Sequence, residues 1–449
     1  MNLPTTNEAT PMSLRTNVMG LGLRALNRFA SLPLVDRLGL RKSSEKAIYQ
    51  AAKTSFRTAG AVGRTFAAAQ KLLKPARLAS ARPSDLFDLT PSDEQQMLRE
   101  AVQNFALEQL RPAAAAADTA CAAPPALLKQ SADLGIAVMG VPEELGGAGH
   151  ERSAMTNVLM AEAMAQGDLS LAVACLAPSA VSTALVLWGS ETQQATYLPA
   201  FVGDNIPAAA LAVLEPRPLF DPFALQTTAR AADGGYVLEG VKSLVPRAAQ
   251  AELFIVAAQL EGMGPALFVV ESKTAGISVE AEPAMGLRAA STGRLTFKNV
   301  KLPASALMGE GKPEIYSECV HLSRLGWCAT AVGTGQAVLD YVIPYVNERV
   351  AFGEPVSHRQ SVAFAVANIG IELEGMRALT YRAASRAEHG KSFAREAALA
   401  RRLCADKGMG IGNDGVQLLG GHGFIKEHPV ERWYRDLRAA GLMEGVLLV

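Results

Sequence analysis

The sequence predicts a mainly α-helical protein with a β-domain inserted between two helical domains. Three observations support this fold class. Apolar residues recur at helical spacing over residues 86–205. Short β-type runs, separated by Gly, Pro and charged residues, fill residues 206–308. Helical spacing then returns over residues 309–449. With a compositionally distinct segment at residues 1–85, the chain is expected to have four parts.

Residues 1–85 are expected to form a basic amphipathic extension. Up to residue 80 the segment has thirteen Lys or Arg residues against three acidic ones, although the whole chain has no net charge. Such a segment suits contact with an anionic membrane surface, an organelle transit peptide, or a helical arm packed on the protein body. The first interpretation predicts a cytoplasmic protein that is peripheral on the inner membrane surface. The second predicts a protein of an organelle matrix, after removal of the transit peptide.

The N-terminal helical domain, residues 86–205, has clear boundary signals. Thr90 is expected to cap its first helix, with Pro91 at the first helical position. The Pro- and Gly-rich stretch "VPEELGGAG" predicts a tight turn. Residues 169–188, "LSLAVACLAPSAVSTALVLW", contain no charge and have the length of a membrane span. Because this stretch contains Pro178 and lacks basic flanks, a buried core helix is the favoured interpretation over a transmembrane one.

The β-domain and the C-terminal domain follow from their periodicity. Runs such as "ELFIVAAQL", "PALFVVES" and "GRLTFKNVKLP" predict strands, whereas "FAVANIGIELEGMRALTYRAASRAEHG" predicts a helix. Neither a strand–GxGxxG–helix unit nor a phosphate-loop lysine motif occurs in the sequence. A Rossmann or phosphate-loop nucleotidase function is therefore not supported.

Composition excludes several other function classes. The five cysteines lie far apart, with no CxxC or Cys/His cluster, which favours reduced thiols and no metal site. The zero net charge gives no global field for binding nucleic acid.

Four stretches in one order resemble the acyl-CoA dehydrogenase family: "VPEELGGAG", "LTFKNVKLPASALMG", "RVAFGEPVSHRQ" and "QLLGGHGFIKEHPVERWYRD". The resemblance covers about residues 88–446. It implies a helical N-domain, a middle β-barrel-like domain and a C-terminal four-helix bundle. It also implies FAD-dependent dehydrogenation of an acyl-CoA thioester to the trans-2-enoyl-CoA, as in fatty-acid β-oxidation. In that reaction a carboxylate removes the α-proton while hydride leaves the β-carbon for flavin N5. An electron-transfer flavoprotein as acceptor and a homo-oligomer, dimer or tetramer, are further implications.

Glu444 is the expected catalytic base. It is the only acidic residue in the C-terminal stretch "AAGLMEGVLLV", and Glu444–Gly445 follows Arg435–Asp436 at the spacing of the family's base motif. A carboxylate among apolar residues is costly unless it is paired or neutralised, and burial raises the pKa of such a group. The alternative is a solvated glutamate in a frayed tail.

The remaining site residues are carried over from the resemblance one at a time. Arg349 in "RVAFG" matches the arginine that reaches the FAD pyrophosphate of a neighbouring subunit. Arg324 in "LSRLGW" matches an arginine near the thioester and CoA part of the substrate. The other expected cofactor contacts on the adenine-dinucleotide side are Phe352, Gln360, Gln417, Gly420 and Gly421.

Three positions near the flavin ring depart from the family pattern. Leu214 replaces a threonine that contacts the ring, Val245 lies where the family has a "WIT" motif, and Phe220 replaces a serine near the CoA. Each lost hydrogen bond weakens binding by about 1 kcal/mol. These losses favour an alternative hypothesis, a catalytically degenerate homologue that serves as a binding or structural subunit with weak or no FAD. An acyl-CoA oxidase is a third hypothesis.

Overall fold

The structure is a computed structural model in which the basic extension is almost entirely undescribed. The described residues are 79–80, 89–136, 140–147, 151–203, 205–232, 234–445 and 447–449. The membrane-surface and transit-peptide interpretations therefore concern residues outside the described part. Within the extension, only β1 (Ala79–Ser80) is described, and it pairs in parallel with β2 (Glu151–Arg152).

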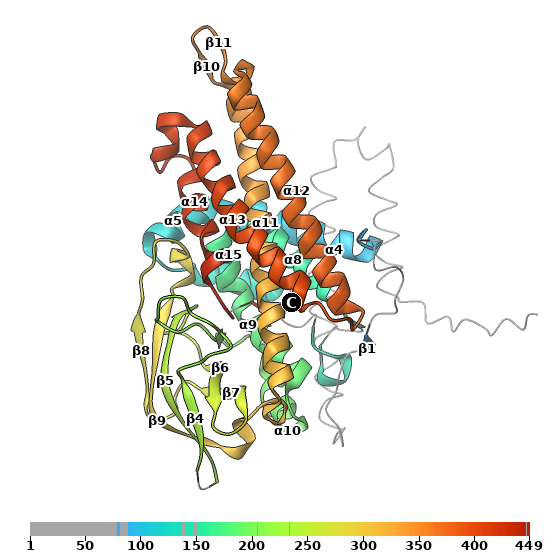
Figure 1. The fold of residues 1–449 in the computed structure, drawn as a ribbon, viewed down its shortest axis with the longest axis vertical. Helices are drawn as coiled ribbons and strands as arrows, with labels where there is room; N and C mark the ends of the chain where they lie inside the picture. The colour runs from blue at the N-terminus through green and yellow to red at the C-terminus, as the bar shows by residue number, and fades with distance from the viewer. Residues whose placement is uncertain are drawn as a thin grey trace, which may run out of the picture. The chain divides into compact units, whose positions relative to one another are not determined.

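Helices dominate the N-terminal part of the described chain (Figure 1). They are α4 (Asp93–Phe105), α5 (Arg111–Ala120), α6 (Pro125–Asp133), α8 (Ala154–Gly167), α9 (Leu169–Trp188) and α10 (Glu191–Phe201), with the π-helical turn η1 (Ala106–Leu110) joining α4 to α5. The predicted start of the first helix is wrong by two residues. Ser92 caps α4, because its side chain accepts a hydrogen bond from the Gln95 N–H at 3.2 Å and the Gln95 side chain accepts one from the Ser92 N–H.

Helix α9 is the uncharged twenty-residue stretch found in the sequence. Among the described helices it is the one long and apolar enough to cross a membrane, but 83% of its most apolar window is buried inside the protein. Asp168 caps its N-terminus, accepting a hydrogen bond from the Leu171 N–H at 3.0 Å. In this structure α9 is a core helix, as the sequence favoured.

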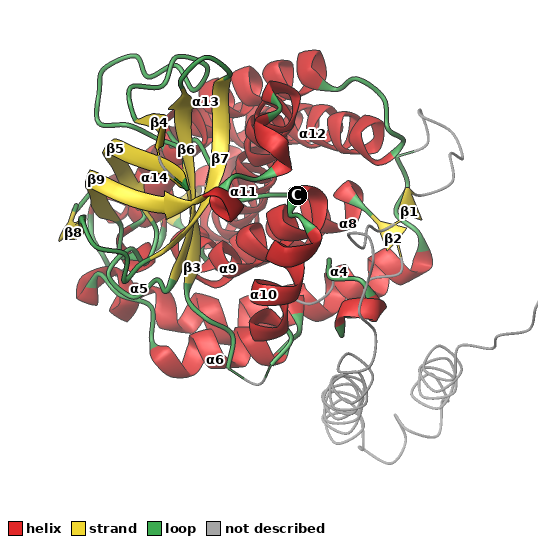
Figure 2. Cartoon of the chain, turned by 90° about the horizontal axis from the view of Figure 1, so that it is seen from below, coloured by secondary structure: helices red, strands yellow, loops and turns green. Residues whose placement is uncertain are grey.

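The β-domain forms one sheet of seven strands beside the helices (Figure 2). The strands are β3 (Ala209–Ala212), β4 (Thr228–Ala232), β5 (Gly235–Val245), β6 (Leu253–Leu260), β7 (Gly264–Glu271), β8 (Ile277–Ala281) and β9 (Gly293–Pro303). Their order is β3-β6-β4-β5-β9-β8, with β7 paired to β6. The β3–β6 and β4–β6 pairs are parallel and the other pairs antiparallel. One face of the sheet packs its own apolar core, and the other joins the helical core.

The C-terminal part returns to helices. They are α11 (Pro313–Glu348), α12 (Gln360–Glu388), α13 (Ala394–Leu418), α14 (Val430–Leu437) and α15 (Ala439–Leu442). The hairpin of β10 (Val350–Ala351) and β11 (Glu354–Pro355) links α11 to α12. Short 3₁₀ turns complete the described elements: η2 (Glu143–Leu145), η3 (Arg288–Ala290), η4 (Ala304–Ala306), η5 (Gly309–Gly311), η6 (Val356–His358) and η7 (Gly420–Phe424). The predicted fold class, helices around an inserted β-domain, is confirmed.

Candidate functional site

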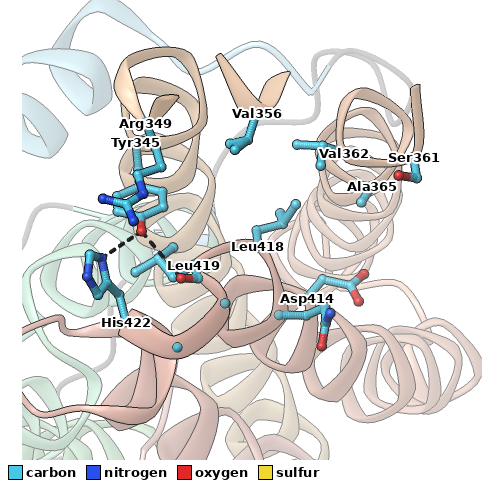
Figure 3. A pocket seen from close by; sticks show the side chains of 13 residues that line it. Tyr345, Arg349, Val356, Ser361, Val362, Ala365, Asp414, Leu418, Leu419 and His422 are labelled. Carbon is cyan, nitrogen blue, oxygen red and sulfur yellow. Dashed lines mark hydrogen bonds between the residues drawn. The ribbon is translucent and has the colours of Figure 1, made fainter. Parts of the chain in front are cut away.

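A cavity of about 600 Å³ lies in the C-terminal part, between the end of α11, the start of α12 and the end of α13 (Figure 3). Four of the residues expected to contact the adenine-dinucleotide line it: Arg349, Gln417, Gly420 and Gly421. The other lining residues were not expected from the sequence: Tyr345, Val356, Ser361, Val362, Ala365, Asp414, Leu418, Leu419 and His422. The volume is within the usual range for small-molecule and cofactor sites.

Glycines keep one wall of this cavity open. Gly420 begins η7 with φ +57, a left-handed conformation that glycine adopts without strain. A methyl group built on Gly420 or Gly421 would meet no other atom within 4 Å. The main chain is therefore accessible along this wall, which suits the close approach of a phosphate-bearing ligand.

Arg349 also lines the cavity, directly after the end of α11 and beside Tyr345 (Figure 3). Its side chain is exposed and forms no ion pair within the part of the chain that the structure describes. One helical turn earlier, the Tyr345 hydroxyl shares a hydrogen bond of 2.8 Å with His422 Nδ1 and donates to the Leu419 carbonyl at 3.3 Å. The hydrogen bonds of Tyr345 thus fix the end of α11 against the segment with Leu419 and His422. The Arg349 guanidinium stays free to bind a ligand. A guanidinium binds phosphate oxygens in bidentate fashion, so the residues present fit a pyrophosphate.

Phe352 and Gln360 are close in sequence to residues that line this cavity, but they do not line it themselves. Phe352 and Gly353 form the two-residue turn of the β10–β11 hairpin, with φ of +55 and +88. The Phe352 side chain is 95% exposed, and the Arg359 guanidinium lies 5.9 Å from its ring centroid. Gln360 is exposed at the first position of α12. Within one chain these two residues face solvent.

The residues at the expected flavin-ring positions are apolar and are buried or half-buried. Leu214 is 7% exposed and Val245 is 1% exposed, and both pack in apolar cores. Phe220 is half-buried, with the Arg217 guanidinium 5.4 Å from its ring centroid. In this conformation Leu214 and Val245 offer little surface to a ring system.

A buried ion pair gives Glu215 a structural role beside these changed positions. Lys242 is fully buried, and its Nζ donates to Glu215 Oε1 at 2.9 Å and to the Val213 carbonyl at 3.0 Å. Burial lowers the pKa of Lys242 to about 8, although Glu215 opposes the shift. The pair ties the turn after β3 to strand β5, so this part of the site is structural.

Glu444 is buried at 4% exposure, not solvated. Arg324 of α11 donates from Nη2 to Oε1 at 2.8 Å and from Nε to Oε1 and Oε2 at 3.1 and 3.2 Å. Arg401 of α13 places Nη2 3.1 Å from Oε1. The sequence predicted an apolar surrounding for this carboxylate, and the structure adds two guanidinium groups to it.

The main chain at Gly445 fixes this segment against two elements. Its carbonyl accepts hydrogen bonds from Ser323 Oγ at 2.8 Å and Trp327 Nε1 at 2.9 Å, both on α11. Gly445 also forms an antiparallel bridge with Ala212 of β3. Its φ is +72, and a Cβ there would lie 2.7 Å from Val213 Cγ2, so glycine is required. Glu444 therefore sits where the β-domain meets the C-terminal helices.

Aromatic side chains cover the outer side of Arg324. The Phe223 ring centroid lies 6.0 Å from the Arg324 guanidinium carbon, and the same ring packs edge-on against Tyr316 at 6.1 Å. The Tyr316 hydroxyl donates to the Pro222 carbonyl at 2.6 Å, which holds the loop after β3 in place. The structure thus brings the two predicted residues Arg324 and Glu444 together. It keeps them apart from the cavity at Arg349.

Arg401 was missed in the sequence, although a signal for it exists. The segment "LARRLC" contains two adjacent arginines, Arg401 and Arg402. Buried residues of α13 include Ala397 and Cys404, four before and three after Arg401. That helical spacing puts Arg401 on the inner face and Arg402 outside.

The comparison with known proteins agrees with this architecture. Family models for the N-terminal, middle and C-terminal domains of acyl-CoA dehydrogenases match residues 92–204, 210–300 and 314–447. The chain is 34% identical over 359 residues to the short-chain specific acyl-CoA dehydrogenase of Bos taurus mitochondria, covering 78% of this chain and 86% of that relative.

Solved structures show the same likeness. Butyryl-CoA dehydrogenase from Megasphaera elsdenii superposes with a TM-score of 0.73 at 29% identity, covering 79% of this chain and 95% of that one. The structure described as PigA with FAD and proline also gives a TM-score of 0.73, at 26% identity, with the same coverage.

Proposed function

Because the chain belongs to the acyl-CoA dehydrogenase family, whose members are oxidoreductases acting on CH–CH bonds, we propose that it dehydrogenates an acyl-CoA thioester to the trans-2-enoyl-CoA. The observation that carries this proposal is the buried Glu444, held by two guanidinium groups where the β-domain meets the C-terminal helices. Glu444 is the proposed α-proton base. Butyryl-CoA is the substrate to test first, given the short-chain relative.

One oxygen of Glu444 is better placed than the other to accept the proton. Within the described residues, Oε1 takes three guanidinium contacts, two from Arg324 and one from Arg401. Oε2 takes a single one, from Arg324 Nε at 3.2 Å. We therefore assign Oε2 as the proton acceptor and Oε1 as the anchored oxygen. At 4% exposure the Glu444 carboxylate is largely shielded from water, which suits a base that removes a carbon-bound proton.

FAD is the proposed cofactor. Arg349, Gln417, Gly420 and Gly421 would hold its phosphate-bearing half in the 600 Å³ cavity. When bound, FAD supplies the acceptor for the hydride that leaves the β-carbon. Arg349 would contribute two parallel N–H donors to phosphate oxygens, and the glycine wall would allow close contact with the main chain. An electron-transfer flavoprotein is the proposed electron acceptor.

Substitution of Glu444 by Gln tests the base. E444Q is expected to keep flavin absorbance and to lose butyryl-CoA-dependent reduction of an artificial acceptor by at least about 100-fold, because a general base contributes 10²–10⁴-fold. E427Q, at an exposed glutamate, is the matched control and should behave like the unmodified protein. Unchanged turnover in E444Q would show that another group removes the proton.

The alternative function is a binding or structural subunit without redox activity. The buried Leu214 and Val245 at the flavin-ring positions favour it. It predicts a colourless protein that gains no flavin absorbance when FAD is added, and that shows no butyryl-CoA-dependent reduction. That outcome would contradict the dehydrogenase proposal.

A further inference from the structure

We propose that Arg401 is the positioning residue that aims Glu444, a role distinct from that of Arg324. The inference rests on the proposed function of Glu444 as base. In this role, Arg401 of α13 fixes the segment that carries Glu444, which has little regular structure of its own.

Arg401 contacts both the main chain and the side chain of this segment. Its Nη1 donates to the Met443 carbonyl at 2.7 Å, and its Nη2 donates to the Gly441 carbonyl at 3.3 Å. The same Nη2 lies 3.1 Å from Glu444 Oε1. One planar guanidinium thus fixes the path of the chain and the direction of the carboxylate together. A lysine, with a single ammonium group, cannot reproduce this pattern.

Arg324 has a different set of partners. Its guanidinium donates to the Glu444 carboxylate, and its face lies against the Phe223 ring. It holds the side chain of Glu444 from α11, whereas Arg401 donates side-chain hydrogen bonds to the main-chain carbonyls of Met443 and Gly441. Arg324 therefore contacts Glu444 on the side of the loop after β3, while Arg401 contacts it from α13.

The segment needs such support because its own structure is short. α15 has only four residues, and Met443 and Glu444 follow it in extended or irregular conformation. α13, in contrast, is a helix of 25 residues packed in the bundle. Through its contacts, Arg401 fixes the Glu444 carboxylate relative to α13. A displacement of a catalytic group by about 1 Å can cost on the order of 100-fold in rate.

The test compares R401M and R401K with R402M, which removes the exposed neighbour on the same helix. The substrate is butyryl-CoA and the protein is loaded with FAD. We expect kcat to fall about 100-fold in R401M and on the order of 10-fold in R401K, with KM and flavin content unchanged. R402M should match the unmodified protein. Exchange of the butyryl-CoA α-hydrogen with D₂O, followed by mass spectrometry, should fall in parallel because it reports proton removal alone.

Each other outcome has a definite meaning. R401M with the kcat and exchange rate of R402M would overturn the positioning role. A change in KM alone would overturn it too, because it would show that Arg401 binds substrate. If R401M does not fold, R401K decides, and unmodified kcat in that variant would contradict the inference. If the unmodified protein neither exchanges the α-hydrogen nor reduces the acceptor, the proposed function fails instead.

Discussion

Asp436 is a buried carboxyl whose charge the fold compensates only in part. Its Oδ1 accepts a hydrogen bond from the Leu287 N–H at 2.7 Å, whereas Oδ2 has no hydrogen-bond partner among the described residues. Burial raises the pKa of Asp436 to about 8, with the nearby Asp168 carboxylate acting in the same direction. The Leu287 N–H and the arginines Arg435 and Arg432 oppose the shift.

Stability is therefore expected to depend on pH through Asp436. Its folded pKa lies above the unfolded value of 3.8, so the folded state binds the extra proton. This contribution is fully present below pH 3.8 and is lost as pH rises to about 8. D436N keeps an oxygen for the Leu287 N–H and cannot ionise. Its melting temperature should approach that of the unmodified protein near pH 4 and exceed it near pH 8. An equal difference at both pH values would contradict this.

At the residue scale, the sequence predicted that Glu444 is buried but not which residues pair with it. The burial of Glu444 followed from its apolar neighbours, whereas its role as base, inferred from its spacing to Arg435–Asp436, stays a prediction. Its pairing with Arg401 could not be predicted. The two residues lie 43 positions apart in the sequence, and only the tertiary packing of α13 brings them into contact. The same holds for Lys242 and Glu215, whose contact depends on how β5 returns to the turn after β3.

At the element scale, helices α8 and α11 pack backbone against backbone. A Cβ on Gly333 of α11 would lie 2.0 Å from the Glu162 carbonyl oxygen of α8. That distance is far below van der Waals contact, and backbone cannot move as a flexible side chain does. Gly410 of α13 is the opposite case, because it is exposed and a Cβ there would meet nothing within 4 Å.

These two glycines give a matched prediction of opposite sign. G333A should destabilise the protein by about 1–3 kcal/mol, because overpacking forces α8 and α11 apart. G410A should stabilise it by about 0.5–1 kcal/mol, because alanine is the better helix former. Urea unfolding followed by circular dichroism measures both. Equal effects from the two substitutions would show that the α8–α11 contact is not tight.

Element types were predictable because helix and strand periods are local properties of the chain. The long helices and most strands followed from them. The start of α4 was missed because Thr90 and Ser92 are both good caps, and only the capping box with Gln95 separates them. The β10–β11 hairpin was missed because strands of two residues carry no period.

At the whole-molecule scale, the two halves of the proposed site lie far apart in one chain. Arg324 beside Glu444 belongs to α11, and Arg349 follows the end of the same helix, 25 positions later. At 1.5 Å per residue this separation is roughly 37 Å, well beyond the length of an extended dinucleotide. Figure 1 shows the β10–β11 hairpin at the end of α11 and α12 that points away from the sheet. The sequence predicted the fold class but could not give this distance.

We therefore propose that the Arg349 cavity of one copy serves the Glu444 of another, as the resemblance implied. R349M should lose FAD affinity and activity, and E444Q should lose activity alone. In a hybrid dimer the R349M chain still provides Glu444 and the E444Q chain still provides Arg349, so one complete site forms. Co-expression of both variants with different tags should then recover about a quarter of the unmodified activity, the share of complete sites in randomly assorted dimers. If each chain uses its own cavity, neither chain of the hybrid has a complete site. The purified hybrid would then be inactive, and the shared-site proposal would be wrong.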